Sequence, residues 1–84
     1  MPDEHSPVRH TLALRRIDPE QNLSRFYTLV IERDLFGQVV LVRSWGRIGA
    51  RGREIVEPYL DELEAGAALE RIAARKRRRG YRDL

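Results

Sequence analysis

The stretch Arg43–Gly52, with the sequence RSWGRIGARG, decides the fold of this 84-residue chain, because strand-forming residues give way there to turn-forming ones. It contains the single tryptophan, three of the six glycines and three arginines. Side chains alternate between the two faces of a strand. Arg43, Trp45 and Arg47 therefore project together if the strand continues through Gly46. Gly46 puts no side chain on the opposite face, so another backbone or a ligand can come close there.

Two interpretations of Trp45 follow from this pattern. In the first, the indole stacks on a base or sugar while neighbouring guanidinium groups bind phosphate, so that the stretch contacts a nucleic-acid strand or end. In the second, Trp45 fills the core and the glycines only turn the chain. The residues alone leave both interpretations open.

Outward from this stretch, the sequence predicts four strands, over residues 11–17, 24–33, 38–45 and 53–57. A loop at 18–22 and a hairpin at 34–37, with Gly37 in a turn conformation, separate the first three. The second strand has apolar residues at both its odd and its even positions, so it is predicted to be central and covered on both faces. Pro58 is predicted to end the fourth strand.

A helix is predicted from about Glu62 to Arg79. Asp61 is suited to cap its start, with Glu64 three residues later, and Gly80 to end it. The helical spacing gives an apolar stripe of Ala65, Ala68, Leu69, Ile72 and Ala73. The predicted fold is therefore α+β: a small antiparallel sheet of about four strands with one C-terminal helix packed on one face.

Length and composition predict one domain over residues 10–84, preceded by a disordered polar tail over residues 1–9. The chain has no cysteine, so disulfides and thiolate zinc sites are excluded. His5 and His10 make a poor metal site, and no metal or cofactor is expected. No apolar run approaches the length of a membrane span and no signal peptide is evident, so we expect a cytoplasmic protein without membrane contact.

The net charge of +3 is unevenly distributed. Residues 43–53 carry four arginines and no acid, residues 54–70 carry six acids and no base, and residues 71–84 carry seven bases and one acid. Two basic segments around an acidic one indicate an oriented surface. Against this, such charge runs are commonly solvated helix and loop faces.

No catalytic pattern is visible. The chain lacks a nucleophile–histidine–acid set, and the glycines at 46, 49 and 52 join strand to strand, which is unlike a phosphate-cradling loop before a helix. The acids Glu62, Glu64 and Glu70 fit an ordinary solvated helix face. We therefore expect neither an enzyme nor a small-molecule substrate.

At the level of whole segments, the chain resembles the WGR domain family. Trp45-Gly46-Arg47-Ile48-Gly49 is similar to the family signature, and Asn22–Tyr27 is similar to the family's approach to its second strand, with Arg25 in place of Lys. Gln38–Val42 is similar to the strand before the signature, and Ala67–Tyr81 to the closing helix with its Arg-Gly-Tyr ending. The resemblance runs from about Leu12 to Arg82. It places the chain beside short free-standing bacterial members of a family found also in DNA-dependent poly(ADP-ribose) polymerases and molybdate-regulator-like proteins.

The resemblance implies that Trp45 packs against the sugar and base at a DNA terminus, and that Arg47 contacts either the nucleic-acid backbone or an adjoining domain. Lys76 is predicted to extend its stem along the core edge, and Tyr81 to fasten the helix end to the sheet. The candidate nucleic-acid-binding residues are Arg43, Trp45, Arg47, Arg51, Arg53, Arg75, Arg78, Arg79 and Arg82.

The hypothesis from sequence is a non-enzymatic module that binds nucleic acid, with DNA or DNA ends favoured over RNA. Phosphate contacts would supply affinity and Trp45 would supply the preference for a strand or an end. The alternative is a protein-interaction module, in which the acidic stretch Glu54–Glu70 docks a basic partner.

Overall fold

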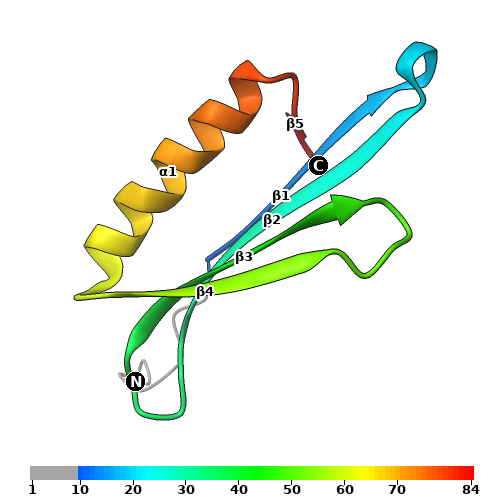
Figure 1. Ribbon diagram of the computed structural model, residues 1–84. Coiled ribbons are helices and arrows are strands. Elements are labelled where there is room, and N and C mark those ends of the chain that lie inside the picture. Colours follow the sequence, from blue (N-terminus) through cyan, green and yellow to red (C-terminus); the bar gives the residue numbers. More distant parts are fainter. Residues whose placement is uncertain (1–9) are drawn as a thin grey trace.

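The computed structural model describes residues 10–84, and the predicted tail at 1–9 lies outside them. It consists of one antiparallel sheet and one long helix, an α+β fold as predicted (Figure 1). The elements are β1 (His10–Asp18), a 3₁₀ turn (Pro19–Gln21), β2 (Leu23–Arg33), β3 (Val39–Arg47), β4 (Arg53–Tyr59), α1 (Glu62–Arg78) and β5 (Arg82–Asp83).

The strand order in the sheet is β4-β3-β2-β1-β5, so consecutive strands β1 to β4 are hydrogen-bonded neighbours. β5 is one strand more than the four predicted. Its two residues pair with Leu14 and Arg15 of β1, after the chain has turned back from the end of α1. The prediction missed β5 because two residues are too few to show any alternation.

Two predictions about the strands are wrong. β2 is central, but α1 covers only one of its faces: Tyr27, Leu29 and Ile31 are buried there, whereas Phe26 on the other face is partly exposed. β4 does not end before Pro58 but continues through it to Tyr59. β4 is an edge strand, and Pro58 is tolerated because an edge residue need not donate to a further neighbour.

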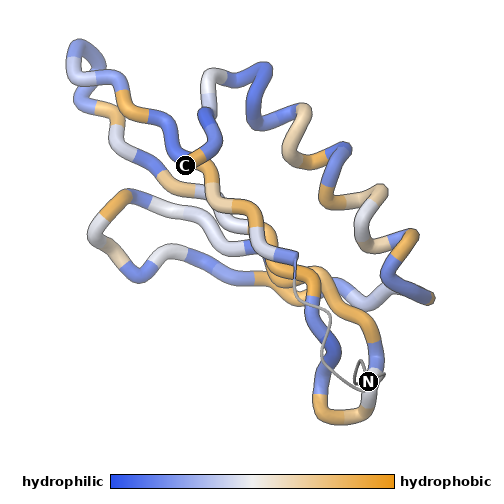
Figure 2. Tube along the Cα trace, turned by 180° about the vertical axis from the view of Figure 1, so that it is seen from behind, coloured by the Kyte–Doolittle hydropathy of each residue, from blue (hydrophilic) through white to orange (hydrophobic). Residues whose placement is uncertain are grey.

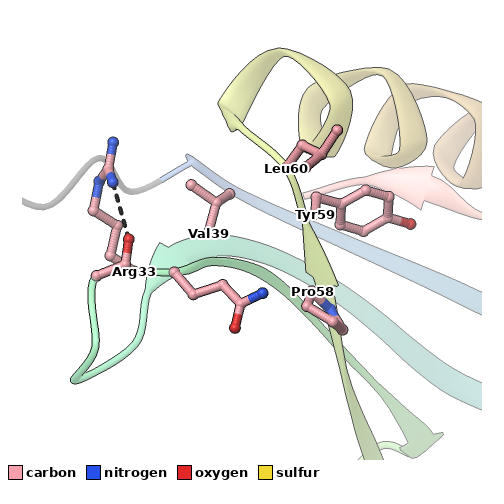
Figure 3. Close-up of a pocket in the computed structure, with 7 residues that line it drawn as sticks. Arg33, Val39, Pro58, Tyr59 and Leu60 are labelled. Atoms are coloured by element: carbon pink, nitrogen blue, oxygen red, sulfur yellow. Dashed lines mark hydrogen bonds between the residues drawn. The ribbon is translucent and has the colours of Figure 1, made fainter.

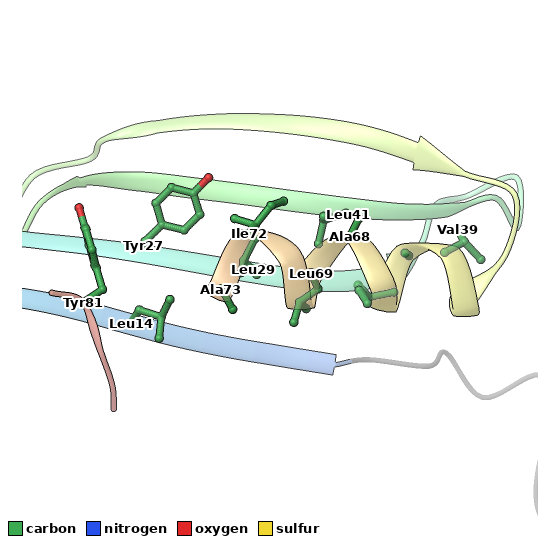
Figure 4. Close-up of a cluster of buried hydrophobic side chains, with 12 residues drawn as sticks. Leu14, Tyr27, Leu29, Val39, Leu41, Ala68, Leu69, Ile72, Ala73 and Tyr81 are labelled. Carbon is green, nitrogen blue, oxygen red and sulfur yellow. The ribbon is translucent and has the colours of Figure 1, made fainter. Parts of the chain in front are cut away.

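The core lies between α1 and the covered face of the sheet (Figure 4). The helix contributes all five residues of the predicted apolar stripe, which are buried against Leu14, Leu29 and Leu41. Asp61 caps the helix as predicted, because its Oδ1 accepts a hydrogen bond of 2.9 Å from the backbone N–H of Glu64. Tyr81 is 9% exposed and lies edge-on to Tyr27, so it fastens the end of α1 to the sheet as expected.

Gly46 of the signature and Gly52, three residues beyond its end, allow the start of β4 to lie against β3. A Cβ built on Gly46 would lie 2.7 Å from the Cα of Gly52, and one built on Gly52 would lie 2.9 Å from Cζ of Phe26. Gly52 also has a positive φ of 75°. No residue larger than glycine fits this crossing without displacing backbone.

The molecule is elongated, 50 Å by 24 Å by 24 Å. The β1–β2 and β3–β4 connections lie with the C-terminal end of α1 toward one end, and the β2–β3 hairpin lies with the start of α1 toward the other (Figure 1). The hydropathy trace differs between these ends: the last turns of α1 are hydrophilic, whereas the hairpin tip is hydrophobic (Figure 2).

Candidate nucleic-acid interface

β3 continues through Gly46 as far as Arg47, which is the condition under which Arg43, Trp45 and Arg47 project to the same face. Trp45 stands opposite Tyr27 on β2 and opposite Arg53 on β4. Directly paired residues of an antiparallel ladder point to the same face. Arg43, Trp45, Arg47 and Arg53 therefore share the face of the sheet that α1 covers in part.

Trp45 lies where the core meets this open part of the face. Its ring stacks on Tyr27 with centroids 5.9 Å apart and planes 16° from parallel. The residue is partly buried and packs against the core cluster. Both interpretations of Trp45 thus keep a physical basis, since the indole supports the core and retains exposed surface.

Arg43 is fixed by two partners. Its Nε donates a hydrogen bond of 2.8 Å to the hydroxyl of Tyr27, and its Nη1 lies 3.3 Å from a carboxylate oxygen of Glu57. Burial of the guanidinium opposes its charge, but the Tyr27 hydroxyl and the Glu57 carboxylate outweigh burial and raise the pKa of Arg43. Arg43 therefore stays charged, and it lies two residues before Trp45 on the same face of β3.

Arg43, Arg75, Lys76 and Arg79 line a small hollow of about 120 Å³ between β3 and the last turns of α1. The ammonium of Lys76 lies 4.5 Å from the centre of the Tyr27 ring, so its stem follows the core edge as predicted. Burial, and then the nearby charges of Arg79, Arg43, Arg75 and Arg25, lower the pKa of Lys76. The hollow therefore concentrates positive charge that an anion would stabilise.

Two arginines that the sequence interpretation left out join this surface. Arg16 stands opposite Arg25, and Arg25 stands opposite Arg47, so three arginines form a row across β1, β2 and β3 on one face. The side chain of Arg16 also passes close to Gly80. Like charges directly opposite each other destabilise a sheet. The one sequence feature that could have identified Arg25 as part of this surface is its position where the family's similar segment carries a lysine.

We call this surface the basic face. Its cations surround Trp45 and Tyr27 and are Arg16, Arg25, Arg43, Arg47, Arg53, Arg75, Lys76 and Arg79. Within residues 10–84, Arg43 forms an ion pair with Glu57 and the other seven form none. Such a surface has a positive electrostatic potential that attracts a polyanion.

Six of the nine candidate residues thus lie together, whereas Arg51, Arg78 and Arg82 lie elsewhere. Arg51 is exposed in the β3–β4 turn. Arg78 is exposed and follows the buried Ala73 by five positions, which places it about 140° around the helix from that residue. Arg82 pairs with Arg15 and lines a separate hollow on the uncovered face of the sheet.

Other site classes find no support in the described part of the chain. Residues 10–84 contain no group of three or more His, Cys, Asp or Glu side chains that could hold a metal ion. No helix there has the length and apolarity needed to cross a bilayer.

The crowding of like charges predicts how salt changes the stability of the free protein. Raising sodium chloride should screen the repulsion in the basic face and increase stability by about 1 kcal/mol, which raises Tm by about 4–8 °C in a domain of this size. Thermal unfolding followed by circular dichroism measures this. A Tm that falls as salt rises would show that attraction, and not repulsion, dominates the surface.

Comparison with known proteins places these features in a family. The family model described as the WGR domain matches residues 10–84. An uncharacterized protein of Sinorhizobium fredii, y4dW, is 40% identical over 73 residues, which cover 87% of this chain and 36% of that protein. The chain therefore spans about a third of the length of this relative. No solved structure matches.

Proposed function

This chain belongs to the WGR domain family, as its sequence predicted, and from that premise we propose that it is a non-enzymatic module that binds DNA, preferentially at a DNA end. Nucleic-acid binding in general is the activity ascribed to the family. The observation that carries the proposal is the basic face, where eight cations surround a partly exposed tryptophan. Among residues 10–84, only one of these cations, Arg43, has a carboxylate partner.

Phosphate contacts would supply most of the affinity. The row of Arg16, Arg25 and Arg47 crosses three strands, and two strand spacings of about 4.8 Å make it about 10 Å wide. Three successive phosphates in one strand of B-DNA span two axial rises of about 3.4 Å each, or about 7 Å, and the long arginine side chains can adjust to this difference. The row can therefore contact successive phosphates without any change in the sheet.

Trp45 would supply the preference for ends. Its ring is already held by Tyr27 on one side, so the exposed part of the indole needs no ordering when a ligand arrives. A terminal base pair has an open stacking surface, whereas an internal base pair has none. An aromatic platform inside a phosphate-binding surface thus favours a broken strand or an end over continuous duplex.

Fluorescence anisotropy with two DNA molecules of equal length and sequence tests this proposal. One is a linear duplex with free ends and the other is closed by hairpin loops at both ends. Trp45→Ala should weaken binding to the free-ended duplex by about 1–3 kcal/mol, the range for a lost stacking contact, and change binding to the closed molecule much less. Trp45→Phe should fall between.

Thermal unfolding of each variant must accompany the titrations, because Trp45 also supports the core. Affinity that drops equally for both DNA molecules, in proportion to lost stability, would contradict the stacking role. If the unaltered protein binds neither molecule at low salt, where charge attraction is strongest, the nucleic-acid proposal is wrong as a whole.

A further inference from the structure

The end of the molecule that holds the β2–β3 hairpin exposes large apolar side chains. Leu35 and Phe36 at the hairpin tip are 100% and 93% exposed, and Leu60 and Leu63 at the start of α1 are 89% and 83% exposed. We call these four residues the apolar end. Single exposed apolar residues are common, but four at one end of a small domain indicate an interaction surface.

The hairpin holds Leu35 and Phe36 in a fixed position. Oδ1 of Asp34 accepts hydrogen bonds of 2.9 Å from the backbone N–H groups of Phe36 and Gln38. Arg33 donates from Nη1 to the carbonyl oxygen of Gly37 at 3.1 Å, and its Nη2 forms a 2.6 Å ion pair with Glu62 of α1. The loop is tied both to itself and to the helix, so a partner would pay little to order it.

A hollow of about 370 Å³ opens beside this hairpin, between it and the bend that leads from β4 into α1 (Figure 3). Val39, Pro58 and Leu60 contribute apolar surface to its lining, and Arg33 and Gln38 contribute polar groups. The volume is at the lower end of the range of roughly 300–1,000 Å³ for ligand pockets, which is enough to receive a large side chain.

The charge at this end is opposite to that of the basic face. Asp34 lies in the hairpin, and Asp61 and Glu64 lie at the start of α1. The nearby Arg33 is already paired with Glu62. Polyanions are repelled from such a surface, whereas a cationic partner is attracted to it.

We propose that the apolar end binds a basic peptide segment of another protein, one that carries a large apolar side chain among lysines or arginines. The apolar side chain enters the hollow between Gly37 and Leu60, and the adjoining part of the peptide contacts Leu35 and Phe36 at the hairpin tip. The flanking cations face Asp34, Asp61 and Glu64. This inference does not rest on DNA binding. The two surfaces lie at different ends of a molecule 50 Å long, so both can be occupied at once.

Nuclear magnetic resonance titration of the isotope-labelled protein tests this with three synthetic peptides of equal length. The first alternates lysines with leucines, the second replaces each leucine with serine, and the third replaces each lysine with glutamate. We expect saturable shifts of the amides of residues 34–38 and 58–63 with the first peptide alone. Raising salt should weaken this binding.

The double variant Leu35→Ser, Phe36→Ser should bind the first peptide at least about tenfold more weakly, because apolar anchors dominate such contacts. Its fold should be unchanged, since both side chains are exposed. Leu84→Ser is the matched control: Leu84 is also an exposed leucine, at 72%, but lies outside the apolar end, and its loss should leave binding unchanged.

Three results would overturn the proposal. The first is peptide shifts that map to the basic face, and the second is equal binding by the serine or glutamate peptide. The third is flotation of the unaltered protein, but not of the double variant, with phosphatidylcholine vesicles, which would assign the apolar end to a lipid surface. DNA affinity should be the same in the double variant, so failure of this proposal and failure of the DNA proposal are separate outcomes.

Discussion

Gly52→Ala is expected to destabilise the protein by about 2–5 kcal/mol, a large part of the stability of so small a domain. The added methyl group would overlap the carbonyl oxygen of Trp45 and lie 2.9 Å from Cζ of Phe26. The φ of Gly52 is also positive, at 75°, which costs a residue with a Cβ about 1–2 kcal/mol before any clash, and overpacking adds about 1–3 kcal/mol. Urea unfolding measures the total.

Gly49→Ala is the matched control. Gly49 has a positive φ of 92°, but a Cβ there would meet nothing within 4 Å. This variant should therefore lose only the conformational part, about 1–2 kcal/mol. Equal losses in the two variants would mean that the close approach of β4 to β3 contributes nothing to the specific need for glycine at position 52.

Replacing Arg16, Arg25 and Arg47 with glutamine should lower DNA affinity by about two to three orders of magnitude at 0.1 M salt. Each phosphate contact contributes about 0.9 to the slope of log affinity against log salt, so the slope should flatten by about three. Titrations across a salt series measure both quantities. Because the three cations repel one another across the sheet, the free variant should be no less stable than the parent protein.

A variant with the same change in net charge separates a local site from general attraction. Arg15 lies on the uncovered face, and Arg71 and Arg78 are exposed residues on the outer side of α1. Replacing these three with glutamine should change the salt slope far less. If both triple variants flatten it equally, DNA is attracted by the overall charge and the row of arginines has no special role.

The helix was predictable because its signals are local. Asp61, the apolar stripe and Gly80 act within a few residues of one another, and the structure retains each of them. The single-sided burial of β2 was not predictable, because an apolar run at both parities does not reveal how many layers cover a sheet. The continuation of β4 through Pro58 depends on its place at the edge, which only the assembled sheet reveals.

The residues of the candidate site also differ in whether local spacing alone could predict them. Alternation along one strand was enough to place Arg43, Trp45 and Arg47 together. Arg16 and Arg25 required the register between strands, which connects residues far apart in the sequence. The helical spacing could have separated Arg79, near the buried stripe, from Arg78, which points away. The sequence interpretation selected both Arg78 and Arg79 as candidates and did not apply this spacing to them.

Pro58 has a consequence for the behaviour of the protein at high concentration. β4 is the long edge strand of the sheet. The face of the sheet that α1 does not cover carries exposed apolar side chains such as Val56, which is 54% exposed. A sheet of this kind is a template on which further copies could add strand by strand toward fibrils. A proline in that strand removes one of the donors such growth requires. At the opposite edge, the N–H of Leu84 donates to the carbonyl oxygen of Ala13 and occupies part of β1. Both edges of the sheet therefore disfavour the addition of strands from further copies of the protein.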